Sequence, residues 1–178
     1  MSTENGKIRL ATVWLDGCSG CHMSLLDTDE RLIVLAQKVD VVWGPLVDPK
    51  EFPHDVDVTL VEGAISSEED LHRIRQIRSR SRILISLGDC AITGNVPAMR
   101  NKFGADAVLR RGYLENATLE AQIPREIIPR LLPTTRPVHE VAPVDYFIPG
   151  CPPSADLIFS VLSDLLEGKT PNPAAKFG

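Results

Sequence analysis

The chain has 178 residues, a formal net charge of −5 and four cysteines. This length is typical of a domain that buries a core without disulfide bonds, so we expect a single domain over residues 1–178. Positive residues are scattered apart from RIRQIRSRSR at 73–82, which we interpret as the solvated face of a helix, so no nucleic-acid-binding footprint is present. The segment MSTENGKIRL lacks an apolar signal core, and no apolar run approaches the ~20 residues that span a bilayer. We therefore expect a cytoplasmic protein without a membrane anchor.

The first part of the chain alternates between strand and helix patterns. Residues 8–15 are rich in β-forming side chains with an alternating pattern, which predicts a strand. The spacing of leucine and isoleucine predicts a helix over 19–36, broken near 27–29. The segments 39–44 and 57–63 are short, apolar and closed by glycine, which is typical of strands buried on both faces of a parallel sheet.

In the middle of the chain, predicted strands and helices continue to alternate up to about residue 103, and the pattern is then lost. The sequence SSEED at 66–70 has a capping serine followed by acidic residues, which predicts the start of a helix. Residues 82–88 form the fourth predicted strand, and a short helix is expected over 97–103, where proline occupies the first position. The segment 104–144 is rich in proline, so we expect it to be mostly irregular.

The last part of the chain returns to a regular pattern. Residues 145–150 predict a fifth strand, and 154–168 predict an amphipathic helix that Ser154 caps and Gly168 ends. Residues 168–178 form a Pro-rich tail. Strands that alternate with helices predict an α/β fold, a flavodoxin-like doubly wound and mostly parallel sheet with helices on both faces.

Every cysteine follows a predicted strand. Cys18 and Cys21 follow the first strand in LDGCSGCHMSLLD, Cys90 follows the fourth in SLGDCAITGN, and Cys151 follows the fifth in FIPGCPPS. Because parallel strands end at the same edge of a sheet, we expect the four thiols to converge there. Neighbouring glycines would let the backbone approach a bulky inorganic group. They are Gly17, Gly20, Gly88 and Gly150.

Three kinds of site fit a CxxC pair after a strand. A redox disulfide at a helix N-terminus would make the chain a metal-free thiol oxidoreductase, while zinc would use four thiolates, usually from two CxxC knuckles on short loops. One CxxC with two single cysteines, Cys90 and Cys151, the latter followed by proline, favours a [4Fe–4S] cluster over both. Disulfides also rarely persist in the cytoplasm.

Four further residues have less specific roles. Glu62 ends the third predicted strand at the cysteine edge, where its carboxylate would accept hydrogen bonds from loop amides or belong to a proton route. His22 follows Cys21, and we expect it beside the site or at the surface, because four cysteines already suffice as ligands. Trp14 and Trp43 are interpreted as core or interface residues. No phosphate-binding loop supports a flavin at this edge.

The motifs DGCSGCHMSLLD, VEGAI, GDCAITGN and IPGCPP together resemble the small subunit of nickel–iron hydrogenases, and most closely that of cytoplasmic NAD-reducing (bidirectional) hydrogenases. They span residues 16–153 in the family's order. The resemblance implies that Cys18, Cys21, Cys90 and Cys151 ligate the proximal [4Fe–4S] cluster and that this chain carries no catalytic residue. It also implies two kinds of partner, a large subunit with the nickel–iron centre and iron–sulphur/flavin diaphorase subunits that reduce NAD.

The chain also departs from its relatives. Longer hydrogenase small subunits have further cysteines for more clusters, whereas all four cysteines here are assigned, so we expect one cluster only. Many relatives carry a glutamate near the CxxC, where this chain has Asp16, His22 and Met23, so their proton-transfer role is not carried over. The alternative is the related cluster-bearing quinone-reaction subunit of respiratory complex I, which typically opens with two adjacent cysteines instead of CSGC.

Overall fold

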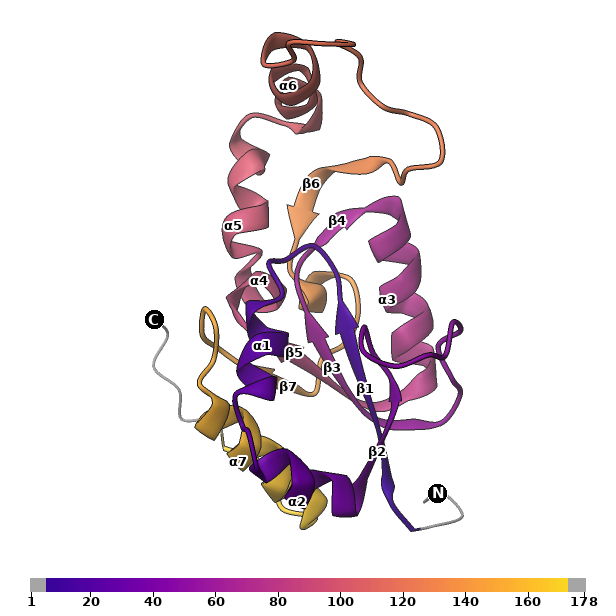
Figure 1. Ribbon diagram of the computed structural model, residues 1–178, viewed down its shortest axis with the longest axis vertical. Coiled ribbons are helices and arrows are strands. Elements are labelled where there is room, and N and C mark those ends of the chain that lie inside the picture. Colours follow the sequence, from indigo (N-terminus) through magenta and orange to yellow (C-terminus); the bar gives the residue numbers. More distant parts are fainter. Residues whose placement is uncertain (1–5, 173–178) are drawn as a thin grey trace.

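The computed structural model describes residues 6–172 and contains a main sheet of five parallel strands (Figure 1). In spatial order the strands are β2 (Val39–Trp43), β1 (Ile8–Trp14), β3 (Val56–Glu62), β5 (Ser81–Leu87) and β7 (Tyr146–Ile148). The chain starts in β1, adds β2 on one side and then β3, β5 and β7 on the other. This reversal is the doubly wound, flavodoxin-like order, and all five predicted strands are confirmed.

Helices cover both faces of the sheet, as expected (Figure 1). They are α1 (Gly20–Leu26), α2 (Arg31–Lys38), α3 (Glu68–Arg80), α4 (Asp89–Thr93), α5 (Asn95–Ala98), α6 (Ala105–Arg110) and α7 (Ala155–Leu166). One core cluster joins α1, α2 and α7 to the sheet, and the other joins α3 and α4 to its opposite face. The break between α1 and α2 is confirmed, because Asp29 has a φ of 52° that a helix does not allow.

Serine caps begin two of the helices at the predicted places. The Ser67 hydroxyl accepts a hydrogen bond from the Asp70 amide, and the Asp70 carboxylate accepts one from the Ser67 amide, which forms a capping box at the start of α3. The Ser154 hydroxyl accepts a hydrogen bond from the Leu157 amide at the start of α7. Each cap satisfies an amide that has no partner within its helix.

The expectation that 104–144 is mostly irregular is wrong in part. This segment contains α6, the π-helical turn η2 (Arg111–Glu115), strand β6 (Leu131–Arg136) and the 3-10 turn η3 (Val138–Glu140). β6 pairs antiparallel with the unpredicted strand β4 (Ile65–Ser67) in a separate two-stranded sheet. Pro133 argued against a strand, but an edge strand tolerates proline because the missing amide hydrogen is not needed by a second neighbour.

The predicted short helix over 97–103 is displaced and split. It is observed as α5 followed by the 3-10 turn η1 (Met99–Lys102). α5, η1, α6, η2 and the loop up to β6 form an arm, residues 95–130, that projects beyond the main sheet (Figure 1). The predicted tail at 168–178 lies mostly outside the described residues, and the single domain stays a prediction. Within 6–172, no helix is long and apolar enough to cross a membrane.

The central strand β3 is buried along its whole length. Leu60 and Ile85 enter the core on the side of α1 and α7, whereas Val61 and Leu84 enter the core under α3. Every one of these side chains is inaccessible to solvent. Burial of one such side chain stabilises the fold by about 1.5–3 kcal/mol, so the middle of the sheet is a rigid platform for the loops at its ends.

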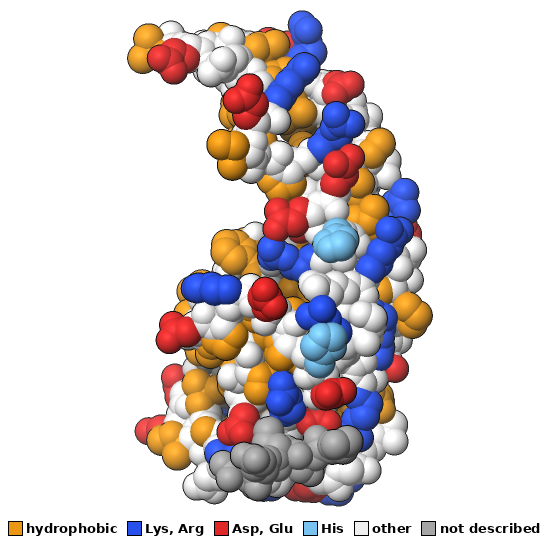
Figure 2. Space-filling model, turned by 90° about the vertical axis from the view of Figure 1, so that its right-hand side faces the viewer, with side chains coloured by type: hydrophobic (Ala, Val, Ile, Leu, Met, Phe, Trp, Pro, Cys, Tyr) orange, Lys and Arg blue, Asp and Glu red, His pale blue; other side chains and the backbone are white. Residues whose placement is uncertain are grey.

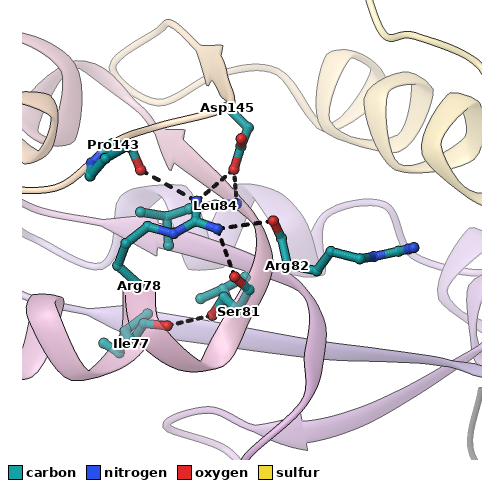
Figure 3. A network of polar contacts seen from close by, with 8 residues as sticks. Ile77, Arg78, Ser81, Arg82, Leu84, Pro143 and Asp145 are labelled. Carbon is teal, nitrogen blue, oxygen red and sulfur yellow. Dashed lines mark hydrogen bonds and ion pairs between the residues drawn. The ribbon is translucent and has the colours of Figure 1, made fainter. Parts of the chain in front are cut away.

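Arg78 joins the end of α3 to the sheet through a network of polar contacts (Figure 3). Its guanidinium donates to the Asp145 carboxylate at 2.6 Å and to the main-chain oxygens of Ser81 and Arg82 at 2.7 and 2.9 Å. The same Asp145 carboxylate accepts a hydrogen bond from the Leu84 amide at 2.8 Å. Arg78 therefore fixes the segment before β7 against β5.

The surface around α3 carries mixed charge. Figure 2 views this side and shows Lys and Arg side chains interspersed with Asp and Glu, and a hollow between the arm and the body of the molecule. The basic run 73–82 covers the later part of α3 and the first two residues of β5. Arg73 pairs with Glu69 at the surface. The side chain of Arg78 is only 22% exposed and has a structural role. Trp14 is 47% exposed, and Trp43 packs edge-to-face on Phe52.

Replacement of Arg78 by alanine should destabilise the chain by about 2–3 kcal/mol, because several hydrogen bonds of a charged and largely buried group are lost. The measurement is urea denaturation of the purified chain followed by circular dichroism. Arg73→Ala removes only an exposed pair and should change the free energy of unfolding by less than about 0.5 kcal/mol. Equal effects of the two substitutions would contradict the structural role of Arg78.

Candidate metal centre

The carboxyl ends of four strands lie side by side at one edge of the main sheet. The pairing register aligns Trp14 with Glu62, Glu62 with Leu87, and Leu87 with Ile148, which are the last residues of β1, β3, β5 and β7. The cysteines follow this row within a few residues. Cys18 lies in the loop after β1, Cys21 in the first turn of α1, Cys90 in α4, and Cys151 in the loop after β7.

The four thiols lie near enough to one another to interact electrostatically. Burial is the largest cause of the raised pKa of Cys21 and of Cys90. Negative charge on Cys90, Cys18 and Cys151 raises the pKa of Cys21 further, and charge on Cys151 and Cys18 raises that of Cys90. The expectation that the strand ends bring the cysteines together at this edge therefore agrees with their placement. Within residues 6–172, no group of three or more His, Cys, Asp or Glu side chains lies close enough to hold a metal ion.

Hydrogen bonds tie the cysteine-bearing loops together. The Asp89 amide donates to the Gly150 carbonyl at 2.9 Å, and the Gly150 amide donates to the Asp89 carboxylate at 2.8 Å. These bonds join α4, which carries Cys90, to the loop of Cys151. On the other side, the Ser24 hydroxyl of α1 donates to the Pro153 carbonyl. The positions of the thiols are thus set by the contacts between loops as well as by the strands.

Glycine leaves room beside the thiols. A Cβ atom on Gly88 would lie 2.2 Å from the Cys21 sulphur, and Gly88 has a φ of 81°, which favours glycine. A Cβ atom on Gly20 would lie 3.3 Å from the Cys18 sulphur. Gly20 and Gly88 therefore lie beside sulphur atoms, whereas a Cβ atom on Gly17 would meet Gly63 and Glu62 and one on Gly150 would meet Pro152 and Pro153.

The thiols differ in burial. Cys18 and Cys151 are exposed, Cys90 is partly buried, and Cys21 is buried. Burial raises the pKa of the Cys21 thiol, and negative charge on Glu62 and the other cysteines raises it further. Burial is also the largest cause of the raised pKa of Cys90. A hydrogen bond from the Val96 amide acts in the opposite direction and offsets part of this increase. Both groups need a positively charged partner to become thiolates at neutral pH.

Glu62 and His22 form a buried pair next to Cys21. The Glu62 carboxylate, 1% exposed, accepts a hydrogen bond from the His22 amide at 2.8 Å and lies 2.5 Å from the His22 ring nitrogen Nδ1. Glu62 accepts a main-chain amide hydrogen bond, as predicted, but from the first turn of α1 and not from a loop. His22 lies beside the site, not at the surface. Glu62 Oε1 and His22 Nε2 are buried without a hydrogen-bond partner in the described part of the chain.

Sequence reasoning missed two hydrogen-bond donors to sulphur. The Asn95 side-chain amide donates to the Cys151 sulphur at 3.4 Å, and the Val96 main-chain amide donates to Cys90. Both residues follow Gly94 at the end of α4. The Gly-Asn pair after Cys90 was a visible turn signal, but only the folded chain shows that this turn faces Cys151, which lies 56 positions from Asn95 in the sequence.

The raised pKa of Cys21 predicts slow alkylation in the cluster-free chain. The thiolate is the reactive species, and a raised pKa lowers its fraction at a given pH, so iodoacetamide should modify Cys21 at least about tenfold more slowly than Cys18 at pH 8. The rate at Cys21 should still be rising at pH 10. Mass spectrometry of timed samples measures both, and a urea-unfolded sample should show similar rates at all four cysteines. Rapid modification of folded Cys21 at pH 8 would contradict its burial.

Comparisons with known proteins agree with the sequence motifs. A family model described as "NADH ubiquinone oxidoreductase, 20 Kd subunit" matches residues 18–165. The delta subunit of the NAD-reducing hydrogenase HoxS of Cupriavidus necator is 44% identical over 173 residues, which cover 94% of this chain and 83% of that subunit. A subunit of the F420-non-reducing hydrogenase vhu of Methanocaldococcus jannaschii is 39% identical over 171 residues, which cover 95% of this chain but only 59% of the relative.

Solved structures give the same result. The crystal structure of an NAD+-reducing [NiFe]-hydrogenase in the H2-reduced state contains a chain that is 38% identical, with a TM-score of 0.91 and coverage of 97% of this chain and 99% of that one. The [NiFeSe] hydrogenase of Desulfovibrio vulgaris Hildenborough has a TM-score of 0.59 at 15% identity over 90% of this chain and 60% of that one, which shows a shared fold alone. The chain therefore belongs to the family of the 20 kDa subunit of NADH ubiquinone oxidoreductase and, within it, to the small subunits of NAD-reducing nickel–iron hydrogenases.

Proposed function

We propose that Cys18, Cys21, Cys90 and Cys151 bind one [4Fe–4S] cluster and that the chain transfers electrons as the small subunit of a NAD-reducing nickel–iron hydrogenase. The observation that carries this proposal is the gathering of four cysteines from three strand ends at one sheet edge, with glycine beside the sulphur atoms of Cys18 and Cys21. The iron–sulphur assignment is also supported by family membership. Four cysteines supply the thiolates of one four-iron cluster.

The residues of this chain would hold the cluster and set its surroundings. A bound cluster supplies one-electron transfer. The four thiolates would anchor it, and Gly88 leaves the space beside the main chain that the Cys21 sulphur occupies. Glu62 adds a buried negative charge on the Cys21 side, while Asn95 and Val96 present N–H groups on the side of Cys90 and Cys151. Charge and hydrogen bonds to sulphur are two of the factors that set a cluster potential.

The cysteine edge has the properties of a surface that a partner covers. Each cysteine-bearing segment carries a large exposed hydrophobic side chain within ten residues of its cysteine in the sequence. These side chains are Trp14, Met23, Val96, Met99 and Phe147. Exposed large apolar side chains are common at protein interfaces, and obligate interfaces commonly bury more than about 2,000 Å². We propose that a large subunit with the nickel–iron centre covers this edge, which brings the exposed Cys18 and Cys151 next to it.

The heterolytic cleavage of H2 would take place on the large subunit. With four cysteines and one cluster, this chain passes electrons from the nickel–iron centre directly to a second partner. We propose an iron–sulphur/flavin diaphorase that reduces NAD in the cytoplasm as that partner. The 44% identity to a subunit of an NAD-reducing hydrogenase supports this assignment.

A second candidate is a subunit of a complex-I-like quinone oxidoreductase. The family model, whose description names the 20 kDa subunit of NADH ubiquinone oxidoreductase, favours it over most of the chain. CSGC in place of adjacent cysteines favours the hydrogenase. The two functions differ in the electron acceptor of the assembled complex.

Replacement of Cys18, Cys21, Cys90 or Cys151 by serine, one at a time, should lower the iron content or convert the cluster, because each thiolate binds one iron. Iron content and the EPR spectrum of the anaerobically purified complex measure the effect. Asp27→Ala alters an exposed side chain at the end of α1 and should leave both unchanged. A cysteine variant that keeps a complete cluster and normal activity would remove that residue from the ligand set.

The assembled complex should reduce NAD with H2. Removal of the flavin-containing subunit should abolish H2-dependent NAD reduction and leave H2-dependent reduction of an artificial dye largely intact, because the dye takes electrons upstream of the flavin. Spectrophotometric assays of the complete and the depleted complex compare the two activities. Reduction of a quinone without reduction of NAD would instead establish the complex-I-like function.

A further inference from the structure

The turn after α4 directs two consecutive N–H groups at two different cysteines. The Asn95 side chain donates to the Cys151 sulphur, and the Val96 main chain donates to Cys90. We propose, given the cluster of the proposed function, that this turn raises the cluster's reduction potential, with Asn95 as the adjustable donor. Asn95 acts through the ligand Cys151, so it is a positioning residue and not a catalytic one.

The backbone of the turn is built for this placement. Gly94 and Asn95 have φ values of 82° and 33°, so two successive residues adopt positive φ. The Gly94 amide closes α4 by donating to the Cys90 carbonyl at 3.0 Å, and α5 begins at Asn95. Glycine and asparagine are the residues that adopt this conformation most readily. The turn therefore reverses the chain directly beside Cys90 and brings the side chain of Asn95 across to Cys151.

The Asn95 amide also connects two cysteine-bearing segments, one that follows β5 and one that follows β7. Cys90 and Asn95 belong to the segment after β5, whereas Cys151 follows β7. Cys151 is exposed and Asn95 is partly buried, so the amide is a fixed donor on the open side of the site. A fixed donor needs no reorientation when the charge of the cluster changes, unlike a solvent molecule.

Electrostatics gives the direction of the effect. Reduction adds one negative charge to the cluster, and part of that charge resides on the cysteine sulphurs. An N–H group that points at such a sulphur stabilises the reduced form more than the oxidised form, and so raises the potential. The buried Glu62 carboxylate on the Cys21 side has the opposite effect, since its negative charge favours the oxidised form. The potential thus reflects a balance between these two sides.

Two substitutions separate the side-chain donor from the turn. Asn95→Gly removes the amide but keeps a residue that adopts positive φ, so the Val96 amide stays on Cys90. Asn95→Asp keeps the shape and replaces the donor by a negative charge. Asn116→Asp is the matched control, because Asn116 is exposed on the projecting arm at the end of η2 and the substitution adds the same charge.

The test is an EPR-monitored redox titration of the complete complex. Asn95→Gly should shift the cluster potential to a more negative value, Asn95→Asp should shift it further, and Asn116→Asp should leave it at the wild-type value. EPR reports only centres that contain a cluster, so a variant with incomplete loading still gives a potential. Pulsed EPR of the reduced cluster should also lose the coupling to one exchangeable proton in Asn95→Gly.

The outcomes distinguish this inference from the proposed function. A wild-type complex without a cluster signal from this chain would refute the proposed function itself. A wild-type cluster whose potential and exchangeable-proton coupling are the same in Asn95→Gly would overturn the role of Asn95 alone. An equal shift in Asn95→Asp and Asn116→Asp would also overturn it, because the effect would then come from charge at any distance.

Discussion

The parallel direction of all five strands in the main sheet is the constraint on which the site depends. It places the ends of β1, β3, β5 and β7 in one row, so the loops that follow them emerge next to one another. Residues that lie more than 130 positions apart, Cys18 and Cys151, come to the same edge for this reason. The buried strand β3 and the hydrogen bonds of Arg78 hold the strands in this alignment. The hydrogen bonds between Asp89 and Gly150 hold the segment of Cys90 against the segment of Cys151.

The Cys21 thiolate is costly to form at this edge without a cofactor. Cys21 is buried beside the Glu62 carboxylate, whose charge opposes thiolate formation. Positively charged iron would reverse that relation, because it binds the thiolates and offsets the negative charge gathered at the edge. Binding of the cluster and loss of the Cys21 proton are then coupled, because a metal-binding cysteine must be deprotonated.

The sequence was sufficient for the features that depend on local pattern. Apolar runs closed by glycine marked the strands, Ser67 and Ser154 marked helix starts, and strand ends followed by cysteine indicated the site. Features that depend on contacts distant in sequence were missed. The β4–β6 pair was hidden by Pro133, since nothing local shows that β6 lies at an edge. The contact between Asn95 and Cys151 likewise exists only because β5 and β7 are neighbours.

The most direct test of the cluster assignment is the metal and sulphide content of the anaerobically purified protein. The account predicts about four irons and about four acid-labile sulphides for each chain, together with a reducible EPR signal. One zinc ion for each chain, with neither iron nor labile sulphide at the four cysteines, would contradict it.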